Sequence, residues 1–154
     1  GITFGFKDSD AQNGTYEDGK NINTESGNPY QVFLTAAHDR LGGRDPGSIE
    51  LSGIELFFDS SSSGATNFSQ VYSNVDVYID DLAGHTYIVG HIDTVPTSFP
   101  VRIPVTLSDA DSASLQAVLK TGQFKTGIMA VVPATAPANF DVKQTLELTF
   151  RALP

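Results

Sequence analysis

The sequence of 154 residues contains no cysteine, no tryptophan and only one methionine. Without cysteine, the chain has no disulfide bond, no thiolate metal site and no thiol nucleophile. Basic residues are also scarce: 9 Lys and Arg stand against 18 Asp and Glu, which gives a net charge of −9. Nucleic acids and anionic membrane surfaces attract basic surfaces, so neither is expected as a partner. No apolar run approaches the roughly 18 residues that a membrane span needs.

The rest of the composition is typical of one globular domain. The length is close to the roughly 150 residues of an average domain. Apolar residues make up 40% of the chain, which is enough for a hydrophobic core. Serine and threonine are abundant and lysine is scarce, which favours an extracytoplasmic location, secreted or at the cell surface. Gly1 is not a natural translation start, so we expect that a leader has been removed.

Alternation of apolar and polar residues dominates the chain and indicates half-buried strands. The clearest case sets four apolar residues against four others, namely Val71, Val75, Val77 and Ile79 against Tyr72, Asn74, Asp76 and Tyr78. We predict strands over residues 2–6, 30–36, 49–58, 71–79, 87–92, 100–107, 123–132 and 142–150. Pro104 supplies no backbone donor, which places strand 100–107 at a sheet edge. The pattern predicts an all-β, mainly antiparallel β-sandwich, immunoglobulin-like or jelly-roll-like, with about eight strands over residues 1–154.

One short helix interrupts this pattern. Ser108 is a good N-cap, apolar residues follow with helical spacing from Leu115, and Gly122 can end the helix. The segments 38–47 and 59–67 are rich in Gly or Ser and are predicted to be a surface turn and a hairpin loop. The predicted core consists of Phe33, Leu51, Leu56, Val75, Val77, Ile79, Ile88, Val101, Ile103, Val105, Leu115, Leu119, Val131, Leu146, Leu148 and Phe150.

The acidic, polar segment 7–29 is predicted to be a long loop, and loops of this length are usually functional or disordered. Its first part alternates acidic and amide side chains, as calcium loops do, because calcium takes about six to eight oxygen ligands. The spacing departs from an EF-hand, since Gly14 stands one position late when the loop starts at Asp8. We therefore predict a calcium site of another geometry, formed by Asp8, Asp10, Asn13, Glu17 and Asp18. The alternative is an acidic loop that only water solvates.

The segment 89–96, VGHIDTVP, resembles the GHxDTVP signature of the aminoacylase-type di-zinc peptidases. The resemblance implies that His91 binds one zinc ion and that Asp93 bridges two. On a regular strand, His91 and Asp93 share a face with His85, Tyr87 and Val89. The family's downstream aspartate and paired-glutamate motifs are missing, and the chain has only three histidines. A zinc hydrolase, or a surface metal site that adds a neighbouring carboxylate, is therefore an alternative to a plain strand end.

Other enzyme signatures do not occur in the sequence. It contains no Gly-x-Ser-x-Gly elbow, no phosphate loop, and no spacing that ties a serine to a histidine and an acid. We therefore expect a protein that is not an enzyme and has no cofactor other than calcium. Carbohydrate remains a possible ligand class, because an outward-facing Tyr72, Tyr78 and Tyr87 would form a stacking platform. The alternative is that these rings only cover a strand surface.

The order of elements from residue 53 to residue 152 carries a second resemblance. A strand, a Ser/Gly-rich loop, a VDVYI strand, a Thr-Val-Pro turn, a VRIPV strand, a short helix and an LELTF strand follow one another. This order is similar to uncharacterised β-sandwich domains of secreted or lipid-anchored bacterial proteins. The resemblance implies an envelope location and a recognition or structural role.

Together these patterns predict a non-catalytic extracytoplasmic structural or interaction module, whose partner is another protein or further copies of itself. One alternative is a subunit of a surface filament. Its basis is the apolar segment 2–6 ahead of a polar linker, which would add as a strand to the next subunit. Pairing of residues 2–6 within their own chain favours the module, whereas pairing with another chain favours the filament.

Overall fold

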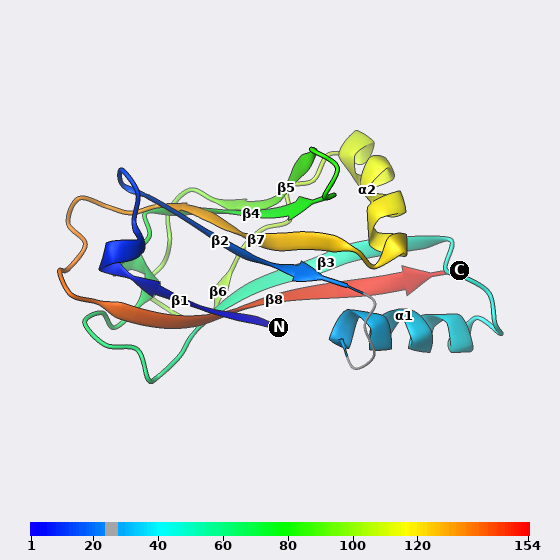
Figure 1. The fold of residues 1–154 in the computed structure, drawn as a ribbon, viewed down its shortest axis with the longest axis horizontal. Coiled ribbons are helices and arrows are strands. Elements are labelled where there is room, and N and C mark those ends of the chain that lie inside the picture. Colours follow the sequence, from blue (N-terminus) through cyan, green and yellow to red (C-terminus); the bar gives the residue numbers. More distant parts are fainter. Residues whose placement is uncertain (24–27) are drawn as a thin grey trace.

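The computed structural model describes residues 1–23 and 28–154. These residues form eight β-strands in two antiparallel four-stranded sheets that pack face to face, together with two α-helices and two short 3-10 helices (Figure 1). The all-β sandwich expected from the alternating pattern is therefore confirmed, with a second α-helix added. Within the described ranges, neither helix has the length and apolar character needed to cross a membrane.

Long strands from both halves of the chain build each sheet. The first sheet has the order β1-β8-β3-β6, with β1 (Ile2–Lys7), β8 (Asp141–Leu153), β3 (Ser48–Phe58) and β6 (Val101–Arg102). The second has the order β2-β7-β4-β5, with β2 (Thr15–Ile22), β7 (Phe124–Val131), β4 (Asn74–Asp80) and β5 (Thr86–Ile92). The helices are η1 (Asp8–Asp10), α1 (Pro29–Arg40), η2 (Phe68–Gln70) and α2 (Asp109–Thr121). Because β3 and β4 belong to different sheets, residues 59–67 connect the two layers and do not form the predicted hairpin.

The predicted strand over residues 30–36 is wrong, because this segment belongs to α1. The Asn28 side chain accepts a hydrogen bond from the backbone N–H of Tyr30 at 2.9 Å, which caps the helix, and Pro29 occupies the first turn. The same helix takes in the first residues of the predicted turn 38–47. The Asn-Pro pair was a helix start signal that the apolar run YQVFLTAA concealed.

The predicted loop over residues 7–29 is wrong over Thr15–Ile22, which form β2 along the full length of β7. Residues 24–27 lie outside the described residues. The alternation in β2 is faint because its inward positions are Tyr16, Asp18, Lys20 and Ile22, of which only the first is buried. An edge strand at the open side of a sandwich needs few apolar residues, so its sequence lacks the usual signal.

The predicted strand over residues 100–107 is shorter than expected, since β6 contains only two residues. Beyond β6 the chain crosses from one sheet to the other: the N–H of Ile103 donates to Ile54 in β3, and the N–H of Thr106 donates to Val89 in β5. The crossing passes close over Gly90, where an added Cβ would lie 3.1 Å from the Pro104 carbonyl oxygen. As predicted, this segment lies at a sheet edge, and it closes one flank of the sandwich.

Ten of the sixteen predicted core residues are buried between the sheets and under α2: Leu51, Leu56, Val75, Val77, Ile79, Val101, Ile103, Leu115, Leu119 and Leu146. Ile88, Val105 and Val131 are wrong, because each is about two-fifths exposed, at 39%, 40% and 41%. Phe33, Leu148 and Phe150 are half-buried. A second part of the core, which the alternating pattern did not predict, is an aromatic cluster of Phe6, Tyr16, Phe68, Tyr72 and Phe140.

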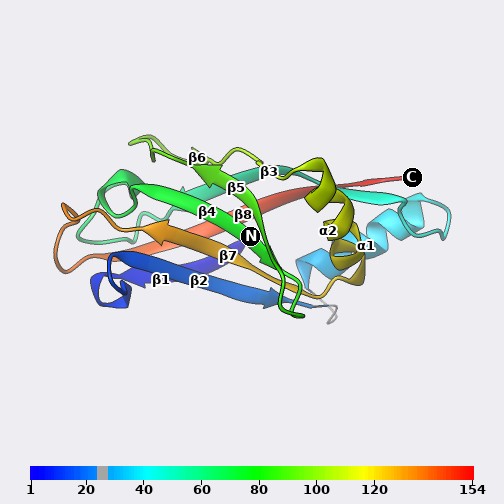
Figure 2. The ribbon, with the colours of Figure 1, turned by 90° about the horizontal axis from the view of Figure 1, so that it is seen from above.

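Both α-helices lie at the end of the sandwich where β8 ends, as two orthogonal views show (Figures 1 and 2). At this end α2 protects the edge of β3, because the Gln116 amide exchanges two hydrogen bonds with the backbone of Ile49, at 2.7 and 2.6 Å. Helix α1 is tied to α2 by the Tyr30 hydroxyl, which donates to the Leu119 carbonyl at 2.7 Å. The α-helices therefore cover one end of the core.

Candidate functional site

A cleft opens between the two sheets at the flank formed by β1 and β2. Its volume is about 660 Å³, within the range of about 300–1,000 Å³ that is typical of small-molecule sites. Residues from β1 and β8 line one wall, residues from β2 and β7 line the other, and the first turn of α1 closes one end. The apolar lining residues are Ile2, Ile22, Tyr30, Phe33, Phe124, Leu146, Leu148 and Phe150.

Aromatic rings hold the helical end of this cleft in place. The Tyr30 ring lies edge-on to Phe124 and Phe150, with centroid distances of 5.0 and 5.2 Å. Burial raises the pKa of Tyr30, whose hydroxyl stays protonated and donates to the α2 carbonyl. Phe33 lies beside Phe150 at 6.2 Å and is only half-buried. The cleft thus has a fixed aromatic end that still leaves apolar surface open.

Five apolar residues around the cleft are incompletely covered: Ile2, Ile22, Phe33, Leu148 and Phe150. They come from four different elements, so no single flexible segment accounts for their exposure. Among the described residues that form the floor, Phe124 and Leu146 are apolar, and the Thr126 hydroxyl donates to the Tyr78 carbonyl at 2.9 Å. The interior of the cleft can therefore bind an apolar group.

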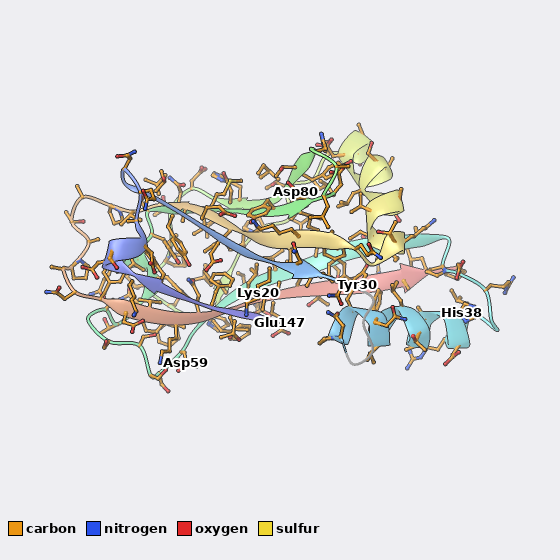
Figure 3. The ribbon with its side chains drawn as sticks, in the orientation of Figure 1. Lys20, Tyr30, His38, Asp59, Asp80 and Glu147 are labelled. Atoms are coloured by element: carbon orange, nitrogen blue, oxygen red, sulfur yellow. The ribbon has the colours of Figure 1, made fainter. Side chains whose placement is uncertain are left out.

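Lys20 and Glu147 stand at the rim of the cleft (Figure 3). Lys20 pairs with Thr126 of β7 and therefore lies on the inner face of the second sheet. Glu147 lies between the inward residues Leu146 and Leu148 in β8, so it belongs to the outer face of the first sheet. The two charged residues thus flank the rim from different faces.

The five residues predicted to bind calcium do not converge on one point. The Asp10 carboxylate accepts from the N–H of Lys7 at 2.8 Å, and the Asp8 carboxylate accepts from the N–H of Asn139 at 3.1 Å. Both belong to η1, while Asn13 forms the turn into β2 with a φ of 52°. These contacts anchor the turn between β1 and β2. The calcium site remains a prediction of the sequence.

Glu17 and Asp18 are neighbours in β2 and point to opposite sides of the strand. Glu17 accepts a hydrogen bond from the Tyr78 hydroxyl and lies 3.6 Å from the Lys125 ammonium, on the outer face. Asp18 accepts from the Tyr16 hydroxyl at 3.0 Å and from the N–H of Gly19 at 2.8 Å. Burial, together with this carboxylate, raises the pKa of Tyr16. Both carboxylates therefore form contacts that hold the edge strand β2 in place.

His91 forms a hydrogen-bonded cluster with two carboxylates on the surface. Its Nδ1 lies 2.5 Å from a carboxylate oxygen of Asp76 in β4, and its Nε2 is hydrogen-bonded to Asp93. The carboxylates of Asp93 and Asp76 raise the pKa of His91. With both ring nitrogens engaged, His91 presents no free lone pair. In residues 1–23 and 28–154, no three His, Asp or Glu side chains gather in a way that would hold a metal ion.

A bulge in β5 explains how His91 meets Asp76. Val77 pairs with Gly90, but Tyr78 pairs with Ile88, so Val89 is an extra residue. One extra residue reverses the alternation. His91 therefore lies on the outer face, whereas Tyr87 and Val89 are buried at 7% and 0% exposure. The prediction that these residues share one face with His91 is wrong, while the proximity of His91 to Asp93 is confirmed.

The three tyrosines proposed as a carbohydrate platform are buried. Tyr72 and Tyr78 are 0% and 4% exposed, and Tyr87 is also covered. Tyr72 follows η2 and is not in β4, so the alternation that placed it outside does not apply. Tyr78 lies across Gly19 on the outer face to reach Glu17. The platform is therefore wrong.

Comparison of the chain with protein-family models, with curated proteins and with solved structures finds no match. The main candidate site is the cleft, which the sequence patterns did not predict. The available signal was Lys20 between Asp18 and Ile22 in an otherwise polar segment, but without the β2–β7 register nothing placed it beside Phe124 or Phe150.

Proposed function

We propose that this chain is a non-catalytic, extracytoplasmic interaction module that recognises its partner through the cleft between β1 and β2. The observation that carries the proposal is the incompletely covered apolar lining contributed by both sheets and α1. Covering such surface stabilises a complex in proportion to the apolar area removed from water. The extracytoplasmic location rests on composition, and the non-catalytic role rests on the absence of enzyme signatures from the sequence and on the mainly apolar interior that the described residues give the cleft.

The pairing of β1 supports a self-contained module. All six residues from Ile2 to Lys7 pair antiparallel with β8 of the same chain, from Leu146 to Asp141. Tyr16 adds a tie between the sheets, because its hydroxyl donates to the Gly5 carbonyl at 2.9 Å. A filament that assembled through residues 2–6 would first have to break these contacts.

The test is binding of N-phenyl-1-naphthylamine, a neutral apolar dye whose fluorescence rises in an apolar environment. We expect saturable binding of one dye per chain. Leu148→Trp fills the cleft with a larger ring and should abolish binding. Val32→Trp is the matched control, because Val32 lies on α1 at 59% exposure and does not line the cleft.

Thermal unfolding and near-UV circular dichroism establish that both variants are folded. Should Leu148→Trp fail to fold, the amide chemical shifts of the wild-type chain provide the same test during dye titration. Shifts centred on Ile22, Phe33 and Leu148 support the proposal. Absence of saturable binding, equal binding to both variants, or shifts centred elsewhere would refute it.

A further inference from the structure

We propose that the cleft binds a monomeric long-chain carboxylate, with the alkyl chain between the sheets and the carboxylate at Lys20. This inference rests on the proposed function, since it names the ligand class of the same cleft. The cleft combines an apolar interior with the Lys20 ammonium at its rim, and these two features complement the two ends of a single-chain anionic amphiphile.

The position of Lys20 in β2 directs its ammonium group to the cleft. Lys20 pairs with Thr126 and Ile22 pairs with Phe124, and all four residues line the cleft. Lys125 also belongs to this sheet but lies on the outer face, where it pairs with Glu17. Of these two lysines, Lys20 is therefore the one that serves the space between the sheets.

Lys20 has no anionic partner among the described residues. Three other basic side chains of the two sheets do pair with carboxylates: Lys125 with Glu17, Arg102 with Glu55 and Arg151 with Glu50. The ammonium groups of Lys7 and Lys143 also form no ion pair among the described residues, but neither residue lines the cleft. The nearest inward carboxylate along the strand, Asp18, is occupied by Tyr16 and Gly19.

The orientation of Glu147 and the N-terminus of α1 favour a carboxylate headgroup over an amine. Glu147 belongs to the outer face of the first sheet, where its partner in the register is Glu55, so it does not project into the space between the sheets. The first turn of α1, which lines the cleft through Asn28, Pro29 and Tyr30, adds the positive end of a helix dipole. Among the described residues that line the cleft, a bound headgroup therefore meets the Lys20 ammonium and a helix N-terminus, whereas the Glu147 carboxylate lies on the outer face.

The apolar interior of the cleft favours an alkyl chain as the rest of the ligand. Phe124 and Leu146 form a buried apolar floor, and the Thr126 hydroxyl is already bonded. Each methylene that enters such a space contributes about fourfold to the affinity. A membrane surface that carries anionic lipids is a less suitable source of this chemistry, because the chain's net charge of −9 repels it.

The experiment measures dissociation constants for dodecanoate, dodecan-1-ol and dodecylammonium below their critical micelle concentrations, by displacement of N-phenyl-1-naphthylamine. We expect dodecanoate to bind most tightly, and affinity to rise about fourfold per methylene from octanoate to decanoate. Lys20→Met keeps an apolar stem and removes the charge. It should weaken dodecanoate binding by about two- to fivefold, as an exposed ion pair predicts, and leave dodecan-1-ol unchanged.

The control variant is Lys7→Met, which changes the net charge equally but lies at the far end of β1 and does not line the cleft. Equal affinities for the three ligands, or equal losses in the two variants, would overturn the inference while dye binding still upheld the proposed function. Binding to vesicles of phosphatidylcholine and phosphatidylglycerol, without binding of monomeric dodecanoate, would also overturn it. Failure of the dye itself to bind would remove the proposed function together with the inference.

Discussion

Tyr72 and Gln144 form a buried polar pair in the aromatic core, and breaking it has a calculable cost. Both side chains are 0% exposed. The Tyr72 hydroxyl donates to the Gln144 carbonyl oxygen at 3.0 Å and accepts from its amide nitrogen at 2.7 Å. Tyr72→Phe deletes one oxygen and leaves the amide of Gln144 buried without its partner. Such a group costs about 1–3 kcal/mol, so we expect a loss of about 2 kcal/mol in the free energy of unfolding.

The reverse change, Gln144→Leu, leaves the Tyr72 hydroxyl buried without its partner and should cost a similar amount. The double variant replaces both groups by apolar ones of similar shape, which is close to neutral. The two single costs should therefore not add: with about 2 kcal/mol lost in each single variant and about 0 in the double variant, the coupling energy should be about 4 kcal/mol in favour of the wild-type pair. For a chain of this length, each single variant should lower the thermal midpoint by about 4–8 °C.

Urea unfolding followed by near-UV circular dichroism measures these differences, because the aromatic cluster supplies the signal. Equal slopes of free energy against urea for all four proteins are needed for the comparison. Single variants that lose less than about 0.5 kcal/mol, or a double variant that loses the sum of both, would show that the pair is not the buried polar contact described here.

Three further predictions concern the edges and the surface. Gly127→Ala should detach β2 from β7 and lower the free energy of unfolding by about 1–3 kcal/mol or more, because an added Cβ would lie 2.0 Å from the Asp18 carbonyl oxygen. The control Gly5→Ala should change stability little, since the nearest atom to its added Cβ lies at 3.9 Å. Equal urea midpoints for the two variants would contradict this prediction. His91 has a raised pKa in the folded chain, so its contribution to stability should be full below its unfolded pKa and should be lost as the pH rises through the folded pKa. The difference in stability between wild type and His91→Gln should therefore shrink from pH 6 to pH 9. An NMR titration that finds the pKa of His91 at or below its ordinary value refutes the reasoning. If Asp8, Asp10, Asn13, Glu17 and Asp18 bind calcium, millimolar calcium should raise the thermal midpoint, and an unchanged midpoint would remove that prediction.

The sequence determined the sandwich, most of its central core and the helix α2. Central strands such as β4 alternate strictly because one face of each is buried, and α2 has a recognisable cap at each end: the Ser108 side chain at its start and Gly122, with φ of 71°, at its end. These are local signals: they depend on neighbouring residues in the sequence and not on where the segment lies in the fold.

Tertiary structure alone decided the edges, the bulge and the cleft. β2 is a strand because β7 pairs with it, and its own residues Asp18 and Lys20 would be read as loop. The extra residue Val89 moved His91 to the outer face and gave it Asp76, fifteen positions away. Lys20 and Phe150 line one cleft only because two strands from opposite ends of the chain lie at the same opening. Such relations depend on which strands become neighbours, and a pattern of period two is the same for every choice of neighbour.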